Sequence, residues 1–281
     1  MAKPIRSTHA TAGADIDLTT TNAAASPGVK DKAEAHAFVD SLGDGLRENQ
    51  IRLLAGQERA VLLVLQGMDA CGKDGVVKDV VDLFYPTSVS VTAFKAPTDE
   101  EKQHDFLWRF RRQLPAPGSI AVFNRSWYED VGVVKVHRLA DPLVIEQRYA
   151  QINVFEEELT ARGISLVKCF LHISYEEQAQ RMLDRLNDPT KRWKFKTADL
   201  DERDCWADYM TVYSEAVNRC RTEANPWYVV PSDHKWYRDW VIAQLLAETL
   251  DDLTLHYPAR PDLDIPALVE RILSSRQQAR G

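Results

Sequence analysis

The sequence has little cysteine: only four residues in 281, none of them in a C-x-x-C spacing. This scarcity argues against a disulfide framework or a zinc site and is typical of reduced thiols in a cytoplasmic protein. No apolar run approaches the roughly 20 residues of a membrane-spanning helix, and the first 18 residues lack the apolar core of a signal peptide. The net charge of −7 gives no general attraction for nucleic acid. We therefore expect a cytoplasmic protein that binds neither membrane nor nucleic acid.

What the chain does have is a strand followed by a glycine-containing loop at residues 61–75, VLLVLQGMDACGKDG. The apolar run after Ala60 indicates a strand buried on both faces, as in parallel sheets. Gly67, Gly72 and Lys73 then have the spacing of a loop that surrounds phosphates between a strand and a helix. Glycines let backbone N–H groups turn towards an anion, and the helix N-terminus adds partial positive charge. A strand-to-helix turn without a ligand is the alternative, but the flanking elements favour a phosphate site.

One position departs from the usual phosphate loop, because Asp74 stands where a Ser or Thr hydroxyl normally meets Mg²⁺. A bound metal would need another group, and Asp69 inside the loop is the candidate. We interpret Cys71 as a small residue that fits the loop rather than as a reactive thiol. The loop residues assigned to phosphate binding are Gly67, Ala70, Cys71, Gly72, Lys73, Asp74 and Gly75.

Strand-like and helix-like segments alternate along the chain, which is typical of a parallel sheet covered by helices. The predicted strands are residues 60–65, 89–94, 120–123, 166–173 and 227–230. Helices are predicted after the phosphate loop, after Ser174, and at residues 31–54, 98–114, 141–162, 200–223, 234–253 and 265–273. These elements predict a P-loop kinase-like three-layer α/β/α fold with a five-stranded parallel sheet and a helical lid. We expect residues 1–30 to be a disordered arm, residues 31–255 the domain, and residues 256–281 a tail with a short helix.

The third predicted strand ends in Asn124 and Arg125, and Glu129 follows shortly after. Ligands of open α/β folds lie at the carboxyl edge of the sheet, so Arg125 is placed to contact phosphate; a surface salt bridge is the alternative. P-loop enzymes commonly carry an acid for Mg²⁺ at this strand end, whereas Asn124 is uncharged.

Residues 181–196 contain six cations and two acids, which gives a local charge of +4. Arg181 and Arg185 are four residues apart and share one helix face. Asp188 and Pro189 then break the helix into a loop in which aromatic residues alternate with cations. Such a run is usually a solvated face, but the break and the aromatic residues favour a lid over residues 181–198 that closes on an anionic substrate.

Several motifs together, GMDACGKDG, FKAPT, HDFLWR, FNRSWYEDV and RLNDPTKRWKF, resemble the type 2 polyphosphate kinase family over about residues 35–255. The resemblance implies transfer of a phosphoryl group between inorganic polyphosphate and a nucleotide (AMP, ADP or ATP), with Mg²⁺, or Mn²⁺ in its place. It implies catalytic roles for Asp69, Lys73, Arg125 and Arg185, with Asp69 as the metal ligand. In the lid, we assign Arg181, Lys191 and Lys194 to phosphate binding in keeping with the resemblance. Family members that mainly phosphorylate nucleoside diphosphates have Asp in place of Asn124, so the chain resembles the subgroup that phosphorylates both AMP and ADP. We assign Asn124 and Glu129 to acceptor specificity, and we hypothesise that the neutral amide of Asn124 widens the choice of acceptor. The resemblance also implies a homodimer or homotetramer.

Two other functions fit part of the pattern. An ATP-dependent nucleoside monophosphate kinase shares the fold and the lid but favours Ser or Thr at position 74. A non-catalytic P-loop protein that binds nucleotide or polyphosphate would account for the neutral Asn124. The sequence leaves open the reaction direction, the base preference and the polyphosphate chain length.

Overall fold

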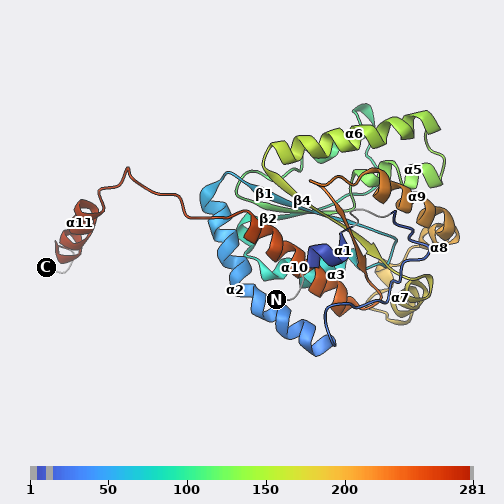
Figure 1. Ribbon diagram of the computed structural model, residues 1–281, viewed down its shortest axis with the longest axis horizontal. Helices are drawn as coiled ribbons and strands as arrows, with labels where there is room; N and C mark the ends of the chain where they lie inside the picture. The colour runs from blue at the N-terminus through green and yellow to red at the C-terminus, as the bar shows by residue number, and fades with distance from the viewer. Residues whose placement is uncertain (1–4, 11–14, 279–281) are drawn as a thin grey trace.

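The computed structural model describes residues 5–10 and 15–278, and its centre is a five-stranded sheet (Figure 1). The strands lie in the order β2-β3-β1-β4-β5, and every neighbouring pair is parallel. Their bounds are β1 Ala60–Gln66, β2 Val89–Ala93, β3 Ile120–Asn124, β4 Ile164–His172 and β5 Trp227–Pro231. β1, the central strand, is buried along its whole length, as its apolar run predicts. The predicted strands are therefore confirmed, with ends that differ by one or two residues.

Helices cover both faces of the sheet, which confirms the three-layer α/β/α fold (Figure 1). The α-helices are α1 Ile5–His9, α2 Lys32–Gly56, α3 Lys73–Asp79, α4 Trp108–Arg111, α5 Val133–Val136, α6 Pro142–Ala161, α7 Tyr175–Asn187, α8 Ala198–Asp204, α9 Trp206–Arg219, α10 Lys235–Asp252 and α11 Ile265–Gln278. The 3₁₀ turns are η1 Val81–Leu83, η2 Pro86–Ser88, η3 Glu101–Gln103, η4 Trp127–Asp130 and η5 Arg192–Lys194. On one side of the sheet α2 and α3 pack against α10, while α6 and α9 lie on the other side.

Side-chain caps set three of the helix starts that the sequence predicts. Asp31, Asp141 and Ser174 each accept a hydrogen bond from a backbone N–H in the turn that follows. α2 continues through Gly43 and Gly45 without a break. The low helix propensity of glycine is outweighed there because α2 packs along α10.

The helix predicted for residues 98–114 is wrong. Its capping box does form: the Thr98 N–H donates to the Glu101 carboxylate at 2.8 Å, and the Glu101 N–H donates to the Thr98 hydroxyl at 3.2 Å. Only the turn η3 follows, because the Asp105 side chain accepts from the backbone N–H two residues later at 3.0 Å and starts a separate turn that leads to α4. The helix predicted for residues 200–223 likewise divides into α8 and α9.

The prediction of a disordered arm over residues 1–30 is wrong for the part that the structure describes. Ile5 and Leu18 belong to the core and are 3% and 2% exposed. The Leu18 N–H also donates to a serine hydroxyl of α9 at 2.9 Å, and α1 packs against α10. Residues 1–4 and 11–14 of the arm lie outside the described residues. The described part of the arm is anchored by isolated apolar residues such as Ile5 and Leu18. These residues form no periodic pattern, so nothing in the sequence indicates their burial.

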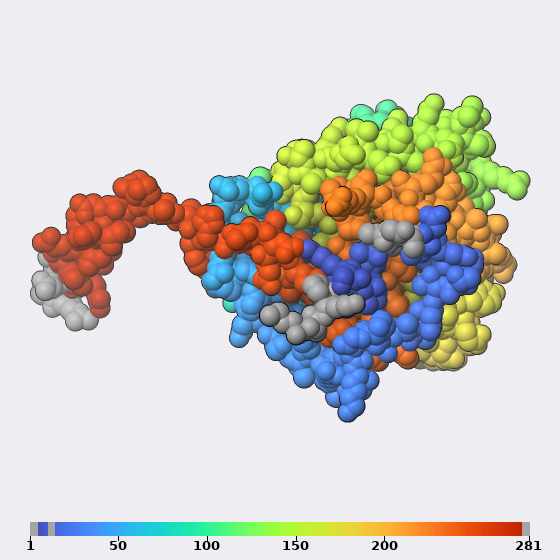
Figure 2. All heavy atoms as spheres, viewed as in Figure 1, coloured from blue at the N-terminus to red at the C-terminus, as the bar shows by residue number. Residues whose placement is uncertain are grey.

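After α10 the chain leaves the domain and ends in α11, which stands apart from the sheet and its helices (Figures 1 and 2). α11 begins at the predicted residue, Ile265, but extends to Gln278. Its apolar side chains, such as Leu268 and Ile272, are exposed. Across the described parts of the chain, no helix combines the length and the apolar character that crossing a bilayer requires.

Candidate active site

The phosphate loop lies between the carboxyl end of β1 and the start of α3, where its motif predicts it. Gly67, Ala70 and Gly72 have φ angles of 145°, 64° and 108°. A positive φ is ordinary for glycine but uncommon for alanine, so the loop holds Ala70 in a strained conformation. Backbone strain of this kind persists where the surrounding contacts fix the loop in one shape.

Lys73, the first residue of α3, is only 8% exposed. Its ammonium donates to the carbonyl oxygens of Gly67 at 2.7 Å and Met68 at 3.1 Å. The thiol of Cys71 lies beside it, with Sγ 3.4 Å from Nζ. All four cysteines are free, as their spacing predicts. The loop thus holds the ammonium on weak carbonyl partners, which a phosphate oxygen can replace.

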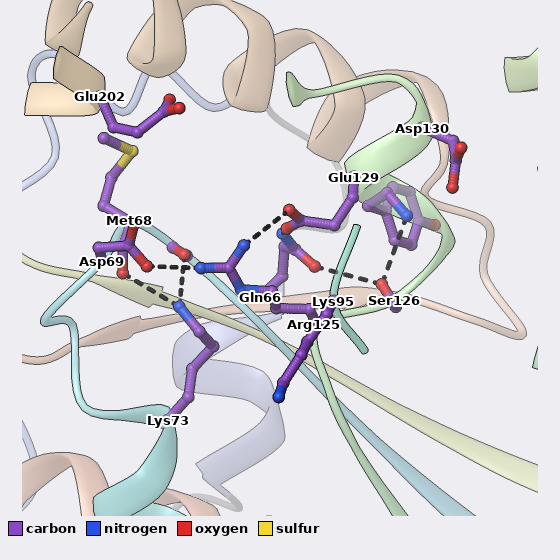
Figure 3. A network of polar contacts seen from close by, with 12 residues as sticks. Gln66, Met68, Asp69, Lys73, Lys95, Arg125, Ser126, Glu129, Asp130 and Glu202 are labelled. Carbon is purple, nitrogen blue, oxygen red and sulfur yellow. Dashed lines mark hydrogen bonds and ion pairs between the residues drawn. The ribbon is translucent and has the colours of Figure 1, made fainter. Parts of the chain in front are cut away.

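Three charged side chains from separate segments meet beside the loop (Figure 3). Nη2 of Arg125 lies 2.6 Å from Oδ1 of Asp69, and its Nη1 lies 3.3 Å from Oε2 of Glu129. Arg125 directly follows β3 and has a φ of 68°, so it is a second non-glycine residue in the left-handed region. Glu129 also accepts a hydrogen bond from the amide of Gln66 at the end of β1. The structure therefore brings the predicted residues Asp69 and Arg125 into direct contact.

The surrounding charges determine the ionisation of Asp69. Burial alone would raise its pKa, but the positive charges of Lys73, Arg125 and Arg185 together hold that pKa below its ordinary value. Burial likewise opposes the charged form of Arg125, and the charges of Glu129 and Asp69 outweigh it and raise the pKa of the guanidinium. Asp69 is therefore an ionised carboxylate at neutral pH and is able to bind a cation.

Asn124 and Asp74 form a contact that no sequence motif indicates. Nδ2 of Asn124 donates to Oδ1 of Asp74 at 2.9 Å. The other carboxylate oxygen of Asp74 lies 3.8 Å from Nζ of Lys194 in η5. Asp74 therefore links the end of β3, the start of α3 and the lid.

The lid, formed by the end of α7 and η5, places its cations differently. Nη1 of Arg185 lies 4.0 Å from Oδ2 of Asp199, and its charge is among those that lower the pKa of Asp69. Lys191 instead pairs with Asp188 at 2.7 Å, and its side chain is 58% exposed. Arg185 thus belongs to the electrostatic environment of Asp69, while Lys191 is engaged within the lid.

Arg181 does not join the charged group around Asp69. It is 6% exposed, and its guanidinium donates to main-chain carbonyls behind the loop, including those of Ala70 and Cys71. A guanidinium that is buried with these partners is not free to contact phosphate. Its position therefore does not support the prediction that Arg181 binds phosphate.

A cavity of about 480 Å³ opens beside Asp69 and Arg125. Its walls combine cations with apolar side chains and aromatic rings, a composition typical of sites for charged small molecules. Lining residues that the sequence analysis did not assign to the site include Lys95, Arg109, Asp130, Arg148, Tyr209 and Tyr213. Lys95 follows β2 at the carboxyl edge that also carries Arg125 and lies in the FKAPT motif, so its place after a strand and this motif were the available signals.

Two guanidinium groups surround a buried carboxyl group in this cavity. Nη2 of Arg109 lies 3.4 Å from Oδ2 of Asp130, and Arg148 donates to the Asp130 main-chain oxygen at 2.8 Å. Burial raises the pKa of Asp130 to about 6, although the charges of Arg109 and Arg148 oppose the rise. The lining of the cavity holds five cations and four carboxyl groups, so a small excess of positive charge remains, which suits a phosphate-bearing ligand.

A larger cavity of about 680 Å³ lies at the opposite edge of the sheet, against the starts of β4 and β5. Its lining includes Arg6, which already pairs with Asp252. Ligands of open α/β folds bind outside the carboxyl ends of the strands. The smaller cavity next to the phosphate loop is therefore the candidate active site.

The candidate site offers one carboxylate for a divalent cation. Within the described residues, no group of three His, Cys, Asp or Glu side chains is arranged to hold a metal ion. In phosphoryl-transfer sites, however, Mg²⁺ is usually held by one or two carboxylates together with substrate phosphates. The ionised Asp69, next to the phosphate loop, fits that mode of binding.

Comparisons with known proteins agree with this geometry. A family model described as Polyphosphate kinase 2 (PPK2) matches residues 29–257. An AMP/ADP-polyphosphate phosphotransferase of Meiothermus ruber is 45% identical over 213 residues, which cover 76% of this chain and 80% of that protein. An ADP-polyphosphate phosphotransferase of Rhodopseudomonas palustris is 39% identical over 280 residues and 95% of each chain.

A solved structure extends the likeness to three dimensions. The crystal structure of polyphosphate kinase 2 from Arthrobacter aurescens TC1 has a TM-score of 0.93 and 42% identity, and the match covers 97% of this chain and 98% of that one. The family model spans the phosphate loop, β3 and the lid, and the shared fold covers nearly the whole chain. The chain therefore belongs to the polyphosphate kinase 2 family.

Proposed function

We propose that the protein transfers a phosphoryl group between inorganic polyphosphate and AMP or ADP, so that ADP or ATP forms. The observation that carries this proposal is the meeting of two anion sites at Asp69 and Arg125: the phosphate loop with Lys73, and the cationic cavity. A reaction between two phosphate-bearing substrates needs such sites end to end, with the reacting atoms already aligned. The names of the relatives from M. ruber and R. palustris support these substrates.

Phosphoryl transfer depends on positioning and on neutralisation of charge. The loop and Lys73 hold the terminal phosphates of polyphosphate, and the cavity holds the acceptor nucleotide with its phosphate towards Arg125. An oxygen of the acceptor phosphate forms a bond to the terminal phosphorus, and the bond from that phosphorus to its bridging oxygen breaks. The shortened polyphosphate leaves with the bonding electron pair. Arg125 and Arg185 offset the negative charge of the group in transfer.

The metal site follows from the same group of residues. Bound Mg²⁺ supplies charge neutralisation and alignment of phosphate oxygens. Asp69 would hold the ion, with phosphate oxygens and water as the remaining ligands, and Mn²⁺ accepts the same oxygen ligands. Asp69 also orients Arg125 through their 2.6 Å ion pair.

We also propose that Asn124 widens the range of acceptors. Its amide donates to Asp74 at 2.9 Å, so the strand end carries no charge of its own towards the acceptor phosphates. Glu129 contributes indirectly, since it contacts Arg125 and fixes the direction of the guanidinium. A neutral strand end accommodates either AMP or ADP, in agreement with the name of the M. ruber relative.

Incubation of the protein with Mg²⁺, long-chain polyphosphate and either AMP or ADP, without ATP, tests the proposed reaction. We expect ADP or ATP to form, as measured by ion-exchange chromatography of the nucleotides. Turnover that requires ATP as donor would identify an ATP-dependent nucleoside monophosphate kinase. Binding of polyphosphate without any turnover would identify a non-catalytic P-loop protein. Either result overturns the proposal.

We further propose that the protein works in the cytoplasm as a homodimer or homotetramer. The four free thiols support the compartment, and the exposed apolar side chains of α11 support association of copies. Light scattering of the purified protein measures the mass of the assembly. The mass of a monomer would contradict the proposed homodimer or homotetramer.

A further inference from the structure

Two buried arginines lie behind the phosphate loop and have no part in the reaction described above. Arg181 comes from α7 and is 6% exposed, and Arg238 comes from α10 and is 2% exposed. Arginine is seldom buried unless its guanidinium has specific partners. The partners of these two side chains show what they do for the loop.

Arg181 binds the loop through main-chain oxygen atoms. Its Nη1 donates to the carbonyl oxygens of Ala70 at 3.1 Å and Cys71 at 3.0 Å. Its Nη2 donates to the carbonyl oxygens of Ser232 at 2.5 Å and Asp233 at 2.9 Å, just after β5. One planar guanidinium therefore joins the loop to the segment that follows β5, the edge strand of the sheet, a geometry that the single ammonium of lysine cannot reproduce.

These hydrogen bonds fix the direction of the loop peptides. No peptide bond in the described chain is cis, and a trans peptide points its N–H away from its own C=O. Because the Cys71 carbonyl is directed at Arg181, the Gly72 N–H is directed away from it. The orientation needed to bind an anion through backbone N–H groups is thus imposed from the rear of the loop.

Arg238 acts on the same loop through its shape. Its Nη1 occupies the space where a Cβ at Gly72 would lie, and a Cβ at Gly75 would be 2.7 Å from Nη2 and 3.3 Å from Cζ. Its Nε donates to Oδ1 of Asp239 at 2.8 Å, which fixes the plane of the guanidinium. The two glycines therefore give Arg238 room to pack directly against the start of α3.

Gly75 is informative because its backbone does not require glycine. It lies in the first turn of α3, and it is absent from the residues with positive φ. In a helix, alanine is ordinarily favoured over glycine by about 1 kcal/mol. The contact with Arg238 is the structural reason that this position has no side chain.

We infer that Arg181 and Arg238 form a loop clamp, a pair of positioning residues that sets the direction of the loop N–H groups and the placement of Lys73 for phosphate binding. The loop clamp contacts no substrate. That the bound ligand is polyphosphate rests on the proposed function. The orientation of the loop by the loop clamp does not.

The first test is a double-mutant cycle between Gly75 and Arg238, scored by kcat/KM for polyphosphate. We expect Gly75→Ala and Arg238→Met each to reduce it by about tenfold or more. The double variant should be no worse than Arg238→Met, since the added methyl group then has no guanidinium to displace. If the loss of kcat/KM in the double variant equals the product of the two single losses, Gly75 and Arg238 act independently. This result would overturn the proposed contact between them. Arg219→Met, which removes an ion-paired arginine at the end of α9, is the matched control.

The second test separates a positioning role for Arg181 from direct phosphate binding. Affinity for inorganic tripolyphosphate is measured by calorimetry at several salt concentrations for the wild type, Arg181→Lys and Arg181→Met. Each ion pair lost with a polyanion lowers the slope of log affinity against log salt by nearly one. We expect both variants to bind tripolyphosphate about tenfold or more weakly, with an unchanged slope of log affinity against log salt. Arg181→Lys should therefore recover little of the affinity that Arg181→Met loses. A reduced slope in Arg181→Met that lysine restores would make Arg181 a phosphate ligand and overturn the inference.

Binding measurements keep this inference distinct from the proposed reaction. A wild-type protein that binds tripolyphosphate but transfers no phosphoryl group defeats the proposed function and leaves the loop clamp testable by affinity alone. Thermal unfolding of every variant is recorded alongside. Should Arg238→Met fail to fold, Gly75→Ala paired with Arg238→Lys completes the cycle. A wild-type protein that binds no tripolyphosphate would overturn both proposals.

Discussion

Lys73 shows how a single side chain is prepared for anion binding before any ligand arrives. Its ammonium is almost fully buried and is held by two carbonyl oxygens of its own loop. We expect Lys73→Ala to reduce ADP formation from AMP and polyphosphate by about 100-fold or more, since a preorganised cation at transferred phosphate is typically worth that much. Lys78→Ala, an exposed lysine on the same helix, is the control. Wild-type rates in Lys73→Ala would remove the loop from the mechanism.

The contact between Asn124 and Asp74 gives a second prediction at the scale of one residue. Asn124→Asp would replace a 2.9 Å hydrogen bond by two facing carboxylates. Their repulsion moves the strand end and adds negative charge beside the acceptor phosphate. We expect AMP phosphorylation to fall more than ADP phosphorylation, measured as the ratio of kcat/KM for the two acceptors. Equal losses for both acceptors would refute the role of Asn124 in acceptor choice.

Asp130 makes stability depend on pH. Its pKa of about 6 in the folded protein is above the ordinary value of 3.8. Folding therefore favours the protonated form of Asp130. Its contribution to the free energy of unfolding is fully present below about pH 4 and is lost as pH rises through 6. The loss is at most about 3 kcal/mol.

Asp130→Asn should remove this dependence. We expect the stability of the variant, relative to wild type, to increase between pH 4 and pH 7, measured by urea unfolding. A relative stability that stays constant over this range would show that Asp130 has an ordinary pKa in the folded protein.

At the scale of elements, a cation of the lid lies beside the start of α3, directly after the phosphate loop. Nζ of Lys194 in η5 lies 3.8 Å from Asp74 at the start of α3. We expect Lys194→Ala to raise KM for polyphosphate by about three- to tenfold and to change kcat less, because a partly exposed cation contributes mainly to substrate capture. Steady-state kinetics at two salt concentrations check this, with the exposed Lys30→Ala as control. A fall in kcat at constant KM would instead place Lys194 in the transfer step.

At the scale of the whole molecule, α11 is separate from the domain that carries out the proposed reaction (Figure 1). Its apolar residues are exposed, so they add nothing to the core of their own chain. We expect deletion of residues 261–281 to change the unfolding temperature by less than about 3 °C and to preserve polyphosphate-dependent activity, because surface changes usually have small effects. Calorimetry and the nucleotide assay measure both. A large loss of either would show that the tail supports the domain.

The sequence was most informative where the physics is local. The phosphate loop, its buried strand and the start of α3 are contiguous, so glycine spacing and one apolar run predict the position of Lys73. Placement after a strand similarly predicts that Arg125 reaches the carboxyl edge of the sheet, where it contacts Asp69. Capping residues mark helix starts for the same reason: the donor and the acceptor are within one turn.

The tertiary structure decided what depends on distant partners. Spacing placed Arg181 on the lid face with Arg185, but hydrogen bonds to the carbonyl oxygens of Ser232 and Asp233, between β5 and α10, turn it towards the rear of the loop. The cavity takes its walls from segments far apart in the chain, and the arm around Leu18 is ordered by contacts with α9. A local sequence pattern specifies the backbone turns that nearby residues can form. The partners of a buried charged side chain come from distant parts of the chain, so they are decided only when the helices pack on the sheet.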